Sequence, residues 1–122
     1  MAETMEIIDV NAWLGSWPFD YFREDTAAKL DALLASEGIS RAYVSTPEAA
    51  LNPDYAEANR RLIRRVKRYK RLRPVVTLDP TIRGWRDALA GYCEGGIHAV
   101  HMMPGYHDYG CFSEDAAAFV EA

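Results

Sequence analysis

The sequence predicts an α/β protein made of four β–α units with parallel strands, and three observations support this prediction. Short apolar runs alternate strictly with longer helical patterns along the 122 residues. Strict alternation implies a parallel sheet, because parallel neighbours need helical crossovers. The runs are apolar on both faces, as is typical of strands that helices cover on both sides.

The first unit begins with an apolar run at residues 6–10, a predicted strand that leads into a long loop. A helix follows from about Asp25 or Thr26, since either side chain can cap it. Gly38 can take the left-handed conformation that closes this helix. The apolar residues of the helix fall on one face; they are Ala27, Leu30, Leu33 and Leu34.

The second unit has a predicted strand at residues 41–46, followed by a helix that Asn52 and Pro53 open. Proline suits the first helical position, because its missing N–H would have no partner there. The buried stripe of this helix is predicted to be Tyr55, Leu62, Val66 and Tyr69. The third unit has a strand at residues 74–78 and a helix that stops at Gly95–Gly96; its apolar positions are Trp85, Leu89 and Tyr92.

The fourth unit has a predicted strand at residues 97–103, ended by Pro104–Gly105, and a helix capped by Ser113. Glu114 and Asp115 lie in the positive first turn of that helix. Two architectures fit four such units: an open doubly wound sheet, or half of an eight-stranded TIM-type barrel.

The last helix favours the barrel. It stops at Ala122 without a glycine cap, a basic last turn or a proline. We therefore expect residues 1–122 to be a single domain that is the truncated N-terminal half of a (β/α)8 barrel. A self-standing flavodoxin-like α/β domain stays an alternative, although no Gly-rich phosphate loop follows any strand.

Composition narrows the classes of partner. A 49 % hydrophobic fraction permits a core, and a net charge of −4 does not favour nucleic acid. We interpret the basic run at residues 60–71 as the solvent-exposed face of a helix on the outside of the barrel. No apolar run approaches the ~20 residues of a membrane span, and residues 1–6 do not resemble a secretory signal. Cys93 and Cys111 match no zinc or redox spacing, so we expect a cytoplasmic protein with reduced thiols.

Polar and aromatic side chains gather where the predicted strands end, which is the working edge of both architectures. Asp9, Asn11 and Trp13 follow the first strand and share one side of it by alternation. Ser45 ends the second strand and Asp79 the third. The loops at this edge are long and aromatic, and their other notable members are Trp17, His101, Tyr106, His107 and Asp108.

Each candidate has a functional and a structural interpretation. His101 and His107 can serve as metal ligands or as acid–base groups, since histidine titrates near neutrality. Asp9 and Asn11 can orient a substrate, or they can simply hold the backbone after the strand. Four side chains are predicted to contact substrate: Trp13, Trp17, Asp79 and Tyr106. The two tryptophans are interpreted as packing residues or as a pocket wall and not as reactive groups, and Asp79 can instead begin a turn.

Three segments carry a resemblance to a known family. Residues 7–15 (IIDVNAWLG) resemble the first strand of amidohydrolase-related barrels, which reads roughly I-D-x-H-x-H-x-G. Residues 96–104 (GIHAVHMMP) are similar to the fourth strand, and residues 78–80 (LDP) to the end of the third. The segments occur in the family's order and cover the first four of its eight units.

The resemblance implies a metal-dependent hydrolase that acts on a small carbonyl-type substrate at the barrel mouth, by hydrolysis or a related decarboxylation. It also implies a divalent metal, usually zinc, bound by two first-strand histidines. Here those positions are Asn11 and Trp13, and indole is not a ligand. His101 stands where many members carry lysine or glutamate, and the remaining family ligands would lie beyond Ala122.

We therefore expect the full protein to be an enzyme, and this chain to be inactive alone. The alternative is a metal-free relative that acts as a binding or scaffold protein. The expected partner is a small-molecule substrate, and not nucleic acid or a membrane. A homo-oligomer is also possible, because half a barrel exposes an unpaired strand at each edge.

Overall fold

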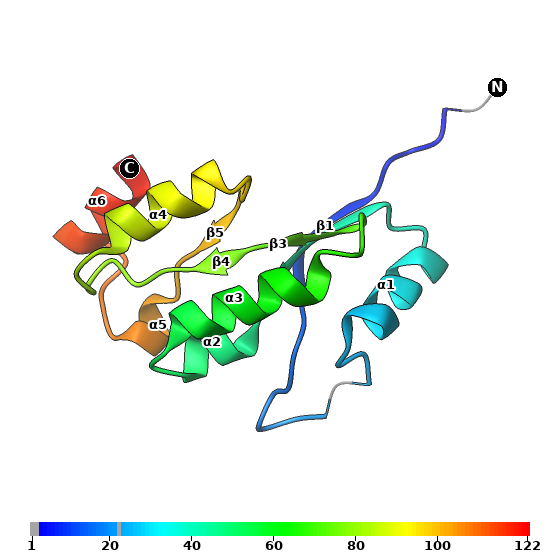
Figure 1. Cartoon of the computed structure of the whole chain (residues 1–122), viewed down its shortest axis with the longest axis horizontal. Helices are drawn as coiled ribbons and strands as arrows, with labels where there is room; N and C mark the ends of the chain where they lie inside the picture. Colours follow the sequence, from blue (N-terminus) through cyan, green and yellow to red (C-terminus); the bar gives the residue numbers. More distant parts are fainter. Residues whose placement is uncertain (1–2, 22) are drawn as a thin grey trace.

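The computed structural model describes residues 3–21 and 23–122 as an arc of short parallel strands with helices along it (Figure 1). The strands pair in the orders β1-β2-β3 and β4-β5, and every pair is parallel. This confirms the α/β class with parallel strands; the described residues do not close a barrel. The elements are β1 (Ile8–Trp13), α1 (Ala27–Ser36), β2 (Arg41–Ser45), α2 (Pro47–Leu51), α3 (Tyr55–Val66), β3 (Leu72–Pro74), β4 (Val76–Thr77), α4 (Trp85–Glu94), β5 (Val100–His101), α5 (Pro104–His107) and α6 (Glu114–Glu121).

The predicted third strand, residues 74–78, is observed as two strands, β3 and β4, that follow one another almost in line (Figure 1). The chain changes its hydrogen-bonding partner between them. The Val75 N–H donates to the carbonyl of Val44 in β2 at 2.8 Å, whereas the Val76 N–H donates to the carbonyl of Ala99, just before β5, at 3.2 Å. The two small sheets are therefore joined through one extended segment.

A buried asparagine binds the backbone N–H and carbonyl groups of β4 at the point where β2 has ended and no longer lies beside it. Asn59 in α3 has no exposed surface. Its Nδ2 donates to the Thr77 carbonyl at 2.7 Å, and its Oδ1 accepts from the Thr77 N–H at 2.9 Å. A side-chain amide thus supplies both partners that a neighbouring strand would give, which a buried backbone requires.

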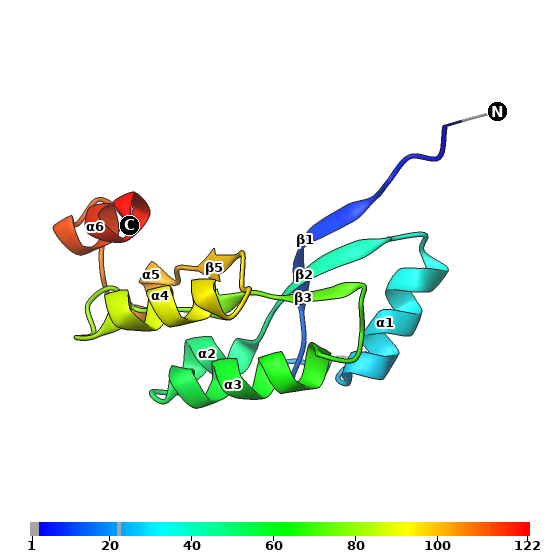
Figure 2. The same ribbon diagram turned by 45° about the horizontal axis from the view of Figure 1, so that its top comes forward.

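The main core lies between the β1–β3 sheet and the helices α1 and α3. Figure 2 shows α1, α2 and α3 on the same side of these strands. The core residues are Ala12, Leu14, Ala27, Leu30, Leu34, Ala42, Val44, Leu62, Val66 and Leu72. The sequence also placed Leu33 on the apolar face of α1. This side chain differs from the other three because it is 39 % exposed.

The caps of three helices follow the sequence prediction. Thr26, and not Asp25, caps α1, since its Oγ1 accepts from the Lys29 N–H at 3.3 Å. Gly38 closes α1 with a φ of +72°, a conformation that favours glycine. Ser113 caps α6 in the same way as Thr26 caps α1, and α4 ends at Glu94 before two glycines.

The start of the second long helix differs from the prediction. Pro53 does not occupy its first position, because Asp54 caps α3 and accepts from the Glu57 N–H at 3.1 Å. A carboxylate is the better acceptor for the free N–H groups of a first turn. The proline that begins a helix is Pro47, at the start of the additional helix α2. The second strand consequently ends at Ser45, one residue earlier than predicted.

The outer strands and the last loop also differ from the prediction. The first strand is Ile8–Trp13 and not residues 6–10, because its pairing with β2 begins only at Ile8. The fourth strand, predicted at residues 97–103, is regular only at Val100–His101, since its partner β4 is equally short. The short helix α5 was not predicted. Within the described residues, no helix is both long and apolar enough to span a bilayer.

Candidate functional site

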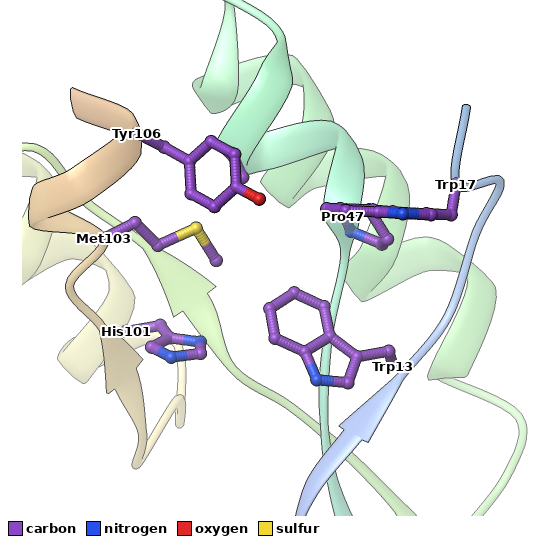
Figure 3. A pocket seen from close by; sticks show the side chains of 7 residues that line it. Trp13, Trp17, Pro47, His101, Met103 and Tyr106 are labelled. Carbon is purple, nitrogen blue, oxygen red and sulfur yellow. The ribbon is translucent and has the colours of Figure 1, made fainter. Parts of the chain in front are cut away.

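A pocket of about 380 Å³ lies where β1, β2 and β5 end (Figure 3). Its volume is within the roughly 300–1,000 Å³ typical of small-molecule sites, and its position is the edge where parallel α/β folds bind ligands. The structure brings four of the predicted site residues to it. The lining consists of Trp13, Trp17, Pro47, Ala50, His101, Met103 and Tyr106.

His101 is the titratable imidazole of this pocket. Its Nδ1 lies 3.0 Å from Oγ of Ser45, which is 4 % exposed. Burial lowers the pKa of His101 below its usual value of 6.5, because the charged imidazolium loses hydration. The ring is therefore neutral near pH 7, with Nδ1 held by Ser45 and Nε2 left to meet a ligand.

Trp13 forms the wall beside His101, with ring centroids 5.5 Å apart. Its indole Nε1–H donates to Oδ1 of Asn11 at 3.1 Å, and the Asn11 N–H donates to Oδ1 of Asp9 at 2.8 Å. This chain of hydrogen bonds fixes the indole from behind. Asn11 and Asp9 do not line this pocket, although Asn11 lines a second hollow together with Ser45 and His101.

The predicted alternation along the first strand is interrupted. β1 pairs Asp9 with Ala42 and Ala12 with Val44, so that it advances by one residue more than β2 between these pairs. Such an extra residue is a β-bulge, and it reverses the faces of the residues that precede it. Asp9 therefore does not share a side with Trp13, which pairs with Ser45.

The opposite wall comes from the loop after β1 and from α5. The rings of Trp17 and Tyr106 meet nearly at right angles, 86°, with centroids 6.5 Å apart. Gly15 allows this loop to approach α2 closely: it is buried, its φ is +127°, and a Cβ there would lie 3.1 Å from Oγ1 of Thr46. No other residue type fits that position without strain.

His107 does not join His101 at the pocket, although both were predicted for one site. It lies at the end of α5, with Nε2 3.2 Å from the carbonyl oxygen of Ala49 in α2. Its ring packs against Tyr55, with centroids 5.9 Å apart. Its Nδ1 is buried and has no partner within the described part of the chain. These contacts hold α5 against α2 and α3.

Asp79 also lies away from the pocket. It is 7 % exposed, and its Oδ1 accepts from the N–H of Thr81 at 2.9 Å and from the hydroxyl of Thr81 at 2.6 Å. It thus begins a turn, as the structural interpretation of Asp-Pro expects. Burial first, and the charge of Asp79 next, raise the pKa of both Tyr55 and Tyr109. Asp108 is exposed and ends α5 with a φ of +57°.

Sequence reasoning did not assign Ser45, Pro47, Ala50 or Met103 to the site. Ser45 gave one signal, its place at the end of the second strand. Its contact with His101 crosses the strand between β2 and β5, and neighbouring strands are ~4.8 Å apart. Only side chains that converge on the inner side of a curved sheet can meet across that span, and curvature cannot be seen in a strand pattern.

The described residues do not fit the zinc site that the resemblance implies. Among residues 3–21 and 23–122, no three side chains of the His, Cys, Asp and Glu types lie close enough to hold a metal ion. At the first-strand positions, the Asn11 oxygen already accepts from the indole of Trp13, and the indole N–H can only donate. Cys93 and Cys111 are both exposed and free.

Comparisons with known proteins place the fold. No family model matches the chain, and no curated protein matches it. The crystal structure of a probable 2-pyrone-4,6-dicarboxylic acid hydrolase from Acinetobacter baumannii, with citric acid bound, is similar, with a TM-score of 0.61 and 16 % sequence identity. The alignment covers 96 % of this chain and 45 % of that one, so this chain spans less than half of its neighbour's length. The likeness establishes a shared α/β fold.

Proposed function

We propose that this chain is the first half of an amidohydrolase-related barrel and that it supplies an acid–base histidine to the hydrolysis of a small carbonyl compound. Two independent findings support the family: the three sequence segments in the family's order, and the fold shared with a hydrolase over 96 % of the chain. The observation that carries the proposal is the position of His101 at the wall of a pocket, with its Nδ1 3.0 Å from Oγ of Ser45. Burial lowers the pKa of this imidazole, which favours its neutral form.

In the proposed reaction, Nδ1–H of His101 donates to Oγ of Ser45, which leaves the lone pair of Nε2 free. Nε2 takes a proton from water, and the water oxygen forms a bond to the carbonyl carbon. The bond from that carbon to the leaving nitrogen or oxygen then breaks, and the imidazolium returns its proton to the leaving atom.

The test compares two histidines on the same chain. 2-Naphthamide and 2-naphthyl acetate are offered to the full-length protein that contains this chain, to its His101→Gln variant and to the matched control His107→Gln, and release of 2-naphthoate or 2-naphthol is followed. Loss of general acid–base catalysis costs roughly 10²–10⁴-fold in rate. We expect that loss for His101→Gln only, with an unchanged melting temperature. Equal rates for His101→Gln and the parent protein would overturn the proposal.

A binding protein without turnover is the second candidate. Asn11 and Trp13 favour it, since neither suits a metal and both are instead used to hold the pocket wall. Saturable binding of 2-naphthamide with no product release would support this candidate over the enzyme.

A further inference from the structure

We infer that the pocket selects an uncharged planar ring compound that carries a carbonyl or amide group, and discriminates against anions such as the citric acid bound by the structural neighbour. The inference states which class of ligand binds at the site of the proposed function. It rests on the proposed function only for the location of that site. It depends on the shape, charge and hydrogen-bonding groups of the pocket wall.

The shape of the pocket suits a flat ligand. Trp13 lies beside His101, while Trp17 and Tyr106 cross at 86° on the other side (Figure 3). The remaining wall consists of small or flexible apolar side chains, Pro47, Ala50 and Met103. Aromatic faces bind other planar rings in stacked or edge-to-face arrangements, and methionine adapts to what lies between them.

The part of the pocket wall that this chain supplies disfavours ions of either sign. None of the described residues that line the pocket is an Arg, Lys, Asp or Glu. Two arginines of α3 are engaged by one acid, since Arg61 and Arg65 lie 2.7 and 3.3 Å from the carboxylate of Glu48. A carboxylate would lose its hydration in this pocket without gaining a counter-charge. A cation would gain the aromatic faces but no carboxylate.

Two polar groups can orient a neutral ligand. The Tyr106 hydroxyl points across the pocket toward Pro47 in Figure 3, where it can donate to a carbonyl oxygen. His101 Nε2 can accept from an amide N–H, because Ser45 already engages Nδ1. A mostly apolar wall with a few convergent polar groups is how small-molecule sites fix orientation.

The test uses three ligands with the same naphthalene ring and substituents of different charge: 2-naphthamide, 2-naphthoate and 2-naphthyltrimethylammonium. Affinities are measured by isothermal titration calorimetry on the same full-length protein at pH 7.5, with citrate as a fourth ligand. We expect 2-naphthamide to bind at least about tenfold more tightly than the other three. Equal or tighter binding of 2-naphthoate or citrate overturns the inference, and so does tighter binding of the ammonium ion or no binding by any ligand.

Variants locate the binding. Trp13→Ala is expected to weaken 2-naphthamide binding by about tenfold or more. Tyr106→Ala is the second variant, and we expect it to keep the fold because Tyr106 is 56 % exposed. Phe112→Ala is the matched control, an equally aromatic but fully exposed side chain outside the pocket. Unchanged affinity in both pocket variants overturns the inference.

The two proposals fail separately. Preferential binding of 2-naphthamide with no release of 2-naphthoate contradicts the hydrolase and leaves the ligand class standing. Hydrolysis of 2-naphthyl acetate that depends on His101, together with equal affinity for charged and neutral ligands, contradicts the ligand class and leaves the hydrolase standing.

Discussion

His101 and His107 are six residues apart at the same edge of the fold, yet their surroundings give them different roles. His101 meets a serine hydroxyl on one nitrogen and a pocket on its other side. His107 meets a backbone carbonyl and the ring of Tyr55, and its second nitrogen is buried. The comparison shows that the functional potential of a histidine at a strand end depends on what the neighbouring helix covers.

The largest expected difference between the two histidines is the effect of their substitution on the stability of the α5 region. His107→Ala removes the partner of a buried carbonyl, because Ala49 has no exposed surface. Leaving such a group unpaired costs about 1–3 kcal/mol. We expect the free energy of unfolding in urea to fall by that amount while affinity for 2-naphthamide is kept. The control is His98→Ala at an exposed position, with a change within about 0.5 kcal/mol. If His107→Ala lost affinity for 2-naphthamide without losing stability, His107 would contribute to ligand binding and not to the packing of α5.

The next effect concerns the support of His101. Ser45→Ala deletes the hydroxyl that holds Nδ1, and a hydrogen bond of this kind contributes about 0.5–1.5 kcal/mol. We expect up to about a tenfold fall in kcat with little change in KM. Ser45→Thr keeps a hydroxyl and should restore most of the rate, which a purely packing role would not produce. If the alanine variant matches the parent in kcat, Ser45 does not position His101.

A smaller effect is expected at Asp79, the acid that the sequence placed with the two histidines. Asp79→Ala removes the acceptor of two hydrogen bonds from Thr81, and we expect a loss of about 1 kcal/mol in unfolding free energy. Asp79→Asn keeps the accepting oxygen and should lose less. It also removes a charge that raises the pKa of Tyr55 and Tyr109, so ultraviolet titration should show tyrosine ionisation at lower pH. An unchanged titration would mean that burial alone sets those pKa values.

The two histidine environments also show what could be predicted from the sequence. Local rules predicted the parallel β–α order, the caps at Thr26 and Ser113 and the working edge, because these depend on neighbouring residues. They also brought Trp13 and His101 to that edge.

What could not be predicted depends on non-local geometry. The early end of the second strand makes room for α2, and α2 then covers His107 with the carbonyl of Ala49. Asn59 makes that early end possible by replacing the missing strand at Thr77. The contact of Ser45 with His101 needs the curvature of the whole arc. None of these three features has a signature in hydrophobic periodicity.

The smallest expected effect is the pH dependence that His101 gives to stability. Burial lowers its folded pKa below 6.5, the ordinary value that the unfolded chain keeps. Well above pH 6.5 the imidazole is neutral in both states and contributes nothing. As pH falls below 6.5, the unfolded state binds a proton before the folded state does, so stability decreases until pH passes the folded pKa. We expect the melting temperature to fall between pH 7.5 and pH 5.5, and His101→Gln to flatten part of that slope. The window lies above the ordinary pKa values of carboxylates, which limits their contribution. A slope of the same size in His101→Gln would show that protonation of His101 is not linked to unfolding, and the neutral imidazole on which the proposed chemistry depends would lose its support.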